Sequence, residues 1–295
     1  LVNFPMGKET NYGEYFASKP NENSLLTQKE LESLISYGLS AGADLVEIFI
    51  EKTESIACLA EQDIISTVNP SFGRGAGIRV FKGYKDGFYS TNILSFSGLK
   101  NALDYALGML GLQTNGSKYS IFDGLYDLKD YSLLKNNNIS NLPNIEEISQ
   151  KILQGTDLLR KYGKNLSTRK GSYSRVKQEV IIAASDGTHV KDIRLHQSIG
   201  LNVLATDKEH RSSIGRRYGS ALNPKALTDW DVTTSAEDNC ESANAMLYAD
   251  YVKAATKPVI LANRFGGVIF HEACGHLLET TQIERGTSPF SDKLN

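Results

Sequence analysis

Apolar residues recur at helical spacing in four stretches of the chain, with apolar side chains three or four positions apart on one face. The predicted helices cover residues 27–41, 99–106, 145–159 and 235–251. The first has a clear start signal, because Thr27 and Glu30 have the spacing of a capping box. In the last helix, one apolar stripe is predicted to contain Ala236, Cys240, Ala243, Met246 and Leu247.

Between these helices the pattern changes to short runs of β-branched and aromatic residues bounded by polar turn residues, which predicts strands. They lie at residues 45–50, 55–59, 64–68, 77–81, 87–91, 172–184, 188–196, 199–205 and 259–261. Turn residues at 83–86 and at Asp186-Gly187 predict two hairpins. The basic stretch 208–217 is expected to be a solvated loop.

This order predicts an α+β fold with two helix-plus-meandering-sheet units, residues 25–112 and 145–255. A polar arm (1–24) precedes them, a linker rich in Asn, Gly and Ser (113–144) joins them, and residues 256–295 begin a third region. Gly75-Ala-Gly-Ile-Arg-Val in the first unit resembles Ser198-Ile-Gly-Leu-Asn-Val in the second. Either an old duplication or two hairpins of similar composition would explain this resemblance.

Charge and composition narrow the class of protein. With 32 Lys and Arg against 34 Asp and Glu, the formal charge is −2, so there is no excess of positive charge to hold a nucleic acid.

No apolar run approaches the roughly 20 residues that span a bilayer, so we expect no membrane segment. Three widely spaced cysteines suit a reducing compartment, and we expect a cytoplasmic protein. The glycine-rich segment Gly73-x-Gly-x-Gly lacks the lysine of a P-loop, so we do not predict a nucleotide-binding site there.

The segment Gly266-Gly-Val-Ile-Phe-His-Glu-Ala-Cys-Gly-His-Leu-Leu-Glu carries the strongest chemical signal. Neutral imidazoles are common zinc ligands, and a carboxylate beside the first ligand can take a proton from an activated water. We therefore predict His271 and His276 as metal ligands and Glu272 as the general base. The alternative is that both histidines lie on a buried helix with ordinary hydrogen-bond partners, and that Glu272 points to solvent.

The spacing of the two histidines requires a distorted helix. Five residues rotate by about 500° on a regular α-helix, which leaves the two imidazoles about 140° apart. They can share an ion only if the helix contains a π-bulge, or if it loosens at Gly275 so that His276 swings back.

The flanks of this segment resemble the TldD/PmbA family, whose members are also called modulators of DNA gyrase. The resemblance is to the TldD type and its HExxxH motif, and it extends to Ala41-Gly-Ala-Asp-Leu-Val-Glu-Ile and Gly87-Phe-Tyr-Ser-Thr-Asn. It implies a zinc peptidase that acts on unfolded or extended peptides in a closed chamber. It also implies a homodimer, or a heterodimer with a PmbA-type partner that lacks the motif.

The resemblance also implies a β-rich C-terminal catalytic domain, which residues 256–295 begin, and a cysteine ligand far downstream. A catalytic zinc normally has three protein ligands, so we expect the third outside this chain and the chain to be truncated. Within it, Cys274, Cys240, Glu279 and Glu284 are weaker candidates. The competing function is that of a non-catalytic binding or regulatory subunit, which would have no need of Glu272 between two potential ligands.

Overall fold

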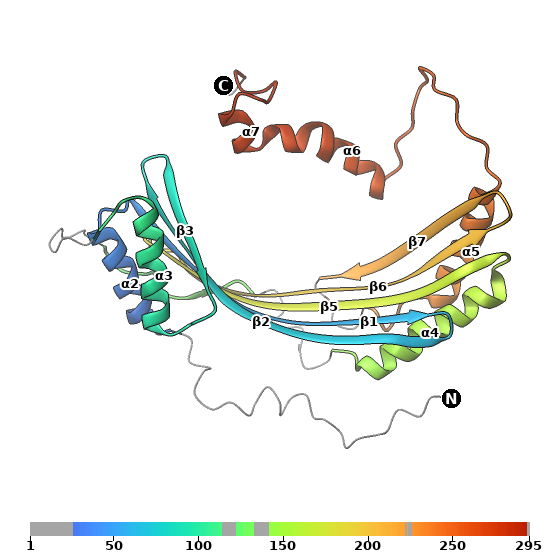
Figure 1. Cartoon of the computed structure of the whole chain (residues 1–295), viewed down its shortest axis with the longest axis horizontal. Helices are drawn as coiled ribbons and strands as arrows, with labels where there is room; N and C mark the ends of the chain where they lie inside the picture. Colours follow the sequence, from blue (N-terminus) through green and yellow to red (C-terminus); the bar gives the residue numbers. More distant parts are fainter. Residues whose placement is uncertain (1–25, 114–121, 133–141, 222, 224–225, 294–295) are drawn as a thin grey trace. The chain divides into compact units, whose positions relative to one another are not determined.

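The structure is a computed structural model that describes residues 26–113, 122–132, 142–221, 223 and 226–293 (Figure 1). The chain forms two compact units, Leu1–Ala249 and Asp250–Asn295. The polar arm predicted at residues 1–24 lies outside the described residues. Within the part of the chain that the structure describes, no helix combines the length and the apolar character needed to cross a membrane.

One seven-stranded sheet runs through the first unit. Its strands are β1 (Leu45–Glu61), β2 (Ile64–Lys82), β3 (Lys85–Thr91), β4 (Lys129–Asp130), β5 (Leu166–Ala184), β6 (His189–Thr206) and β7 (Arg211–Ser220). The order across the sheet is β3-β2-β1-β5-β6-β4, and β7 also pairs with β6. All pairs are antiparallel except the short β4, which is parallel to β6.

The two predicted helix-and-strand units meet within this sheet. β1 pairs with β5 from Glu47 opposite Ala184 to Glu61 opposite Lys170, so both halves contribute to one sheet. Each half has the same element order, which is a helix, three antiparallel strands and a second helix. This repeated order favours the duplication over two unrelated hairpins.

Helices pack on the sheet in two pairs, which Figure 1 shows at opposite ends of the long strands. α2 (Gln28–Ser40) packs with α3 (Phe96–Met109), and α4 (Ile145–Tyr162) packs with α5 (Val232–Leu247). Each helix begins at a polar N-cap whose side chain accepts a backbone N–H, and the capping box predicted for the first helix is confirmed. The predicted stripe of the last helix is buried except at Met246, which is exposed.

Two separate cores lie under the two helix pairs. Val46, Ile48 and Ile50 of β1 pack into the core with α2 and α3, whereas Cys58 and Ala60 of the same strand pack into the core with α4 and α5. Side chains alternate along a strand, so these even-numbered residues lie on one face of β1. Both helix pairs therefore cover the same face of the sheet, and no described helix of the first unit packs on the opposite face, called here the open face.

The middle of β1 explains why the sequence pattern predicted two strands there. Residues 51–57 have no buried side chain, because they lie between the two cores. Their polar residues interrupt the apolar alternation without ending the strand. β6 also unites two predicted strands, 188–196 and 199–205, and the polar Gln197 between them is buried.

Two local predictions were wrong. The basic stretch 208–217 was expected to be a loop, but most of it belongs to β7, an edge strand that leaves its arginines exposed. Edge strands commonly carry exposed charge, because such side chains discourage pairing with other chains. Residues 259–261 were expected to form a strand, but they have neither helix nor strand conformation.

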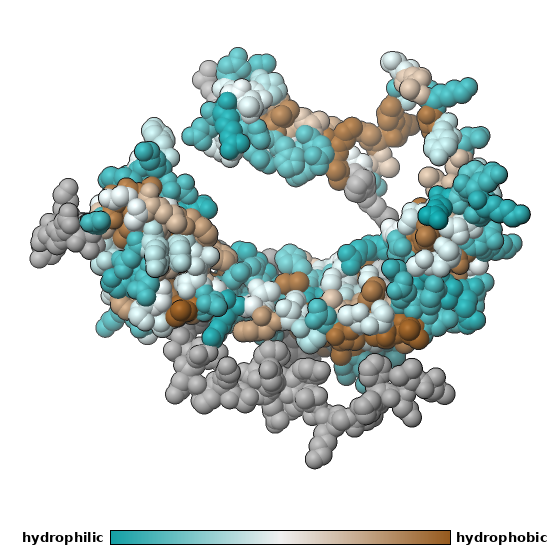
Figure 2. Space-filling view, in the orientation of Figure 1, coloured by the Kyte–Doolittle hydropathy of each residue, from teal (hydrophilic) through white to brown (hydrophobic). Residues whose placement is uncertain are grey.

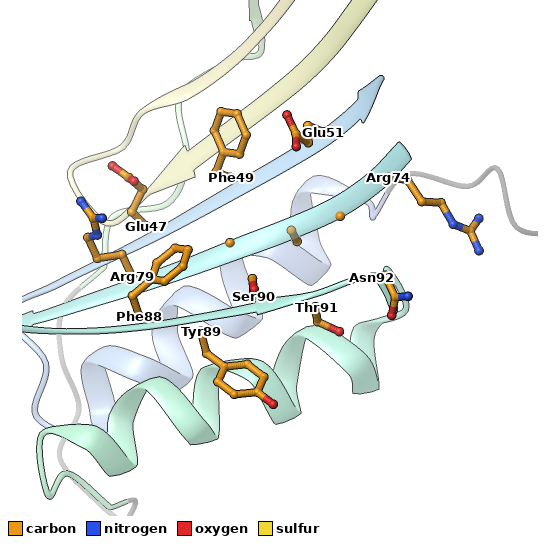
Figure 3. A pocket seen from close by; sticks show the side chains of 13 residues that line it. Glu47, Phe49, Glu51, Arg74, Arg79, Phe88, Tyr89, Ser90, Thr91 and Asn92 are labelled. Carbon is orange, nitrogen blue, oxygen red and sulfur yellow. The ribbon is translucent and has the colours of Figure 1, made fainter. Parts of the chain in front are cut away.

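The open face of β1, β2 and β3 contains a trough of about 740 Å³ (Figure 3). Gly75 and Gly77 of β2 form its floor, opposite Glu51 and Phe49 of β1. A Cβ at Gly77 would lie 2.9 Å from the ring of Phe88, so this position has room for the ring only because it is glycine. The trough is lined by both aromatic and charged side chains.

Candidate metal centre

The second unit carries the two histidines on a series of short helical turns. These are η2 (Arg264–Gly267), α6 (Val268–Phe270), η3 (His271–Gly275), η4 (His276–Leu278) and α7 (Thr280–Glu284). The sequence predicted that residues 256–295 begin a β-rich domain. The described part of this unit has helical turns and no strand.

A π-helical turn joins His271 to His276. η3 is a five-residue π-helix, and the backbone N–H of His276 donates to the carbonyl oxygen of His271, five residues earlier. This is the first of the two distortions that the spacing allowed. Gly275 has ordinary right-handed helical angles, φ −57° and ψ −56°, so the distortion does not depend on a glycine-only conformation.

The π-turn brings three ligand-type side chains together. The rings of His271 and His276 have centroids 4.5 Å apart and planes inclined by 72°. Glu272 Oε2 lies 3.7 Å from His276 Nε2. One ligand atom from each of His271, Glu272 and His276 lies within 4.8 Å of the other two. Within residues 26–293, apart from the undescribed gaps, this is the group of ligand side chains that could hold an ion.

The other ring nitrogen of His276 has a different partner. Its Nδ1 lies 2.6 Å from Glu279 Oε1, at hydrogen-bond distance. The hydrogen bond and the charge of this carboxylate hold the pKa of His276 above its usual value, and Glu272 adds a smaller effect in the same direction. Because both carboxylates favour the imidazolium form, a metal ion competes with a proton for this ring.

The remaining candidates for a third ligand do not join the group. Cys274 lies in the π-turn and is exposed, but its sulfur is not among the clustered ligand atoms. Cys240 is buried in the first unit, where its thiol donates to the carbonyl of Leu159. Glu284, at the end of α7, is also outside the group. Glu279 is outside the group too, and its carboxylate lies at hydrogen-bond distance from Nδ1 of His276.

The described part of the second unit does not bury this segment, as the alternative of a buried helix would require. Its apolar side chains Ile269, Phe270 and Leu278 are each more than half exposed, and the three clustered ligand residues are exposed as well. Figure 2 shows hydrophobic surface along this part of the chain. Exposed apolar patches mark surfaces that other protein segments cover.

The hydrogen bond between Glu279 and His276 was not predicted from the sequence, where Glu279 was only a possible metal ligand. The spacing of three residues between His276 and Glu279 was the available signal, because residues three apart lie on the same side of a helix.

The sequence matches three domains of one protein family. Residues 46–110 match domain 1 of PmbA/TldA metallopeptidases, residues 140–247 match the central domain, and residues 254–295 match the C-terminal domain.

Two relatives named as metalloproteases support the same assignment. The chain is 26% identical over 285 residues to the metalloprotease TldD homolog of Haemophilus influenzae, and this alignment covers 92% of the chain and 58% of the relative. It is 24% identical over 278 residues to the metalloprotease MJ0996 of Methanocaldococcus jannaschii, again with 92% and 58% covered. The chain thus spans less than two thirds of the length of these relatives.

Solved structures share the fold. A Thermotoga maritima protein described as a candidate modulator of a DNA gyrase superposes with a TM-score of 0.56 at 14% identity, over 78% of this chain and 50% of that one. TldE from Thermococcus kodakarensis gives 0.50 at 20% identity, over 73% and 47%. The three domain matches, which together cover more than half of the chain, show that the chain belongs to the PmbA/TldD metallopeptidase family.

Proposed function

We propose that the intact protein is a zinc-dependent peptidase that cleaves unfolded or extended peptides, with His271 and His276 as ligands and Glu272 as general base. The observation that carries this proposal is the π-helical turn. By closing a hydrogen bond between the two histidines, it gathers both imidazoles and the carboxylate within 4.8 Å. A regular helix would hold the two imidazoles about 140° apart.

The side chains present fit a zinc ion. Zinc takes imidazole nitrogens at about 2.0–2.1 Å, so two ligand atoms on one ion lie about 3–3.5 Å apart. A ligand atom of His271 lies within 4.8 Å of one of His276, so side-chain adjustment alone would bring the two nitrogens into that range. Two histidines leave one protein ligand to be supplied, and we propose that it lies outside these 295 residues.

The residues of the motif divide the work of hydrolysis. When bound, zinc supplies a Lewis acid that polarises the peptide carbonyl and lowers the pKa of the attacking water. Glu272 accepts the proton of that water on a carboxylate oxygen and then delivers it to the leaving amine nitrogen. Because its Oε2 lies 3.7 Å from His276 Nε2, this carboxylate is close enough to the ligand atom to serve an adjacent water.

We further propose that the protein works in the cytoplasm as a dimer, either with itself or with a PmbA-type subunit. The exposed apolar side chains beside the motif support burial of this segment by further protein.

Replacing Glu272 by Gln in the intact protein tests the assigned role of this carboxylate. We expect hydrolysis of an unfolded peptide to fall by about 10²–10⁴-fold, since this is the contribution of a positioned general base. Zinc content should stay at the wild-type level, because the ligands are unchanged. Wild-type proteolysis by the purified variant, or loss of zinc, would refute this role.

A binding subunit without catalysis is the second candidate, and the trough of the first unit favours it. This trough offers aromatic and charged side chains on an open sheet face and contains none of the metal-site residues. The two candidates differ in their need for metal. A subunit of this kind would bind an unfolded peptide equally well after zinc is removed with a chelator and would cleave nothing when zinc is restored.

A further inference from the structure

We propose that Glu279 is a positioning residue that fixes His276 with its proton on Nδ1 and its lone pair on Nε2, facing the metal site. This inference rests on the proposed function. Its central observation is the 2.6 Å distance between Glu279 Oε1 and His276 Nδ1, which is short for a hydrogen bond from nitrogen to oxygen.

The backbone around Glu279 places its carboxylate on the ring. η4 ends at Leu278, and the backbone of the next residue, Glu279, is extended with φ −64° and ψ 135°. Its N–H donates to the carbonyl of His276, and its own carbonyl accepts the N–H groups of Gln282 and Ile283 in α7. Glu279 thus sits at the corner between two helical turns, and it is tied by backbone bonds to both.

A second contact holds the same corner. The hydroxyl of the buried Ser288 donates to the carbonyl of Leu277, and the N–H of Phe290 donates to the Ser288 oxygen. The turn after α7 is therefore hydrogen-bonded to η4 through Leu277, which lies between His276 and Glu279 in the chain. These bonds limit the positions that the Glu279 carboxylate can take.

The hydrogen bond decides which nitrogen can bind a metal. A neutral imidazole carries one N–H, and a carboxylate can only accept, so a proton held on Nδ1 leaves the lone pair on Nε2. Nε2 is also the atom that lies 3.7 Å from Glu272. Ligand histidines commonly donate their other N–H to a carboxylate, which orients the ring and makes the ligand more basic.

Zinc affinity tests this role in the intact protein, with Glu279→Ala, Glu279→Gln and, as a matched control, Glu284→Ala. Glu284 is another exposed glutamate in the same unit and is outside the cluster. Competition with a chelator should show zinc binding weakened by about 10–100-fold in Glu279→Ala. Zinc affinity should fall less in Glu279→Gln, because the amide oxygen can still accept the hydrogen bond from His276. Glu284→Ala should have the zinc affinity of wild type.

The tautomer of His276 provides a readout that needs no metal. Nitrogen chemical shifts of labelled histidine, recorded on zinc-free protein at a pH where the ring is neutral, should show the proton on Nδ1 in wild type and a shift toward Nε2 in Glu279→Ala. Wild-type zinc affinity in Glu279→Ala, or an Nε2-protonated ring in wild type, would overturn the proposal. If wild type binds no zinc, the proposed function fails, and the tautomer alone then decides whether Glu279 orients the ring.

Discussion

His276 has a different neighbour at each of its two ring nitrogens. Nδ1 lies against Glu279, and Nε2 faces Glu272, which adjoins His271 in the chain. An ordinary surface histidine needs neither arrangement. At the scale of single residues, the proposal of a metal site depends on this difference, because Nδ1 is hydrogen-bonded to Glu279 and Nε2 lies near Glu272.

Gly275→Ala should leave the site intact. A Cβ at this position would lie 3.6 Å from His271 Nδ1, which is an ordinary contact, and the backbone angles suit any residue. Alanine in a helical conformation is favoured over glycine by about 0.5–1 kcal/mol. We expect zinc affinity within about threefold of wild type and slightly higher thermal stability, measured by chelator competition and by calorimetry.

Gly275→Pro is the contrasting variant. Proline clashes with the preceding helical turn, so it should disrupt the π-turn and remove zinc. Loss of zinc in the alanine variant as well would show that the glycine itself is required, contrary to the geometry of the turn.

At the scale of elements, the local pattern predicted the helices well and the strands less well. The helix start at Thr27 could be read from the sequence because its capping box is made of residues three apart. The full length of β1 could not, because residues 51–57 lie between two cores and are not buried. β7 was missed because its exposed arginines resemble a loop, although they lie on an edge strand.

Asp231 gives a pH-dependent test of one element, α5. Its carboxylate accepts from the Thr234 hydroxyl and from the N–H groups of Thr233 and Thr234, which holds the pKa of Asp231 below its usual value. A carboxylate whose pKa is lowered by folding stabilises the fold above its unfolded pKa, about 3.9, and this stabilisation is lost as the pH falls through the lower folded value.

Asp231→Ala should therefore lower Tm by about 2–4 °C at neutral pH, and the difference from wild type should shrink below about pH 3.9. Asp231→Asn is the control, since asparagine caps helices well but does not titrate. Thermal unfolding of the three proteins across the acid range measures both effects. A constant difference between wild type and the alanine variant at all pH values would contradict the role of the charge.

At the scale of the whole molecule, the two halves of the first unit share one sheet through the pairing of β1 with β5. The sequence indicated two similar units, but it did not show their union. Partners such as Glu47 and Ala184 lie more than 100 residues apart, and local periodicity carries no information on such pairs. The family resemblance was visible because the motif and its flanks are contiguous in sequence.

Only part of the candidate metal site could be predicted from the local sequence. Its two histidines and Glu272 were predicted from six contiguous residues, whereas the role of Glu279 depends on a turn whose geometry the pattern did not specify. The exposed apolar side chains of this segment form a surface that other protein segments can cover.

Zinc content per chain, measured by elemental analysis of the intact protein purified without added metal, tests the central claim most directly. The measurement compares wild type with His271→Ala and His276→Ala. We predict about one zinc ion per chain in wild type, as one catalytic site requires, and loss of that zinc in both variants. A wild-type protein without zinc, or variants that keep it, would contradict the assignment of these histidines as ligands.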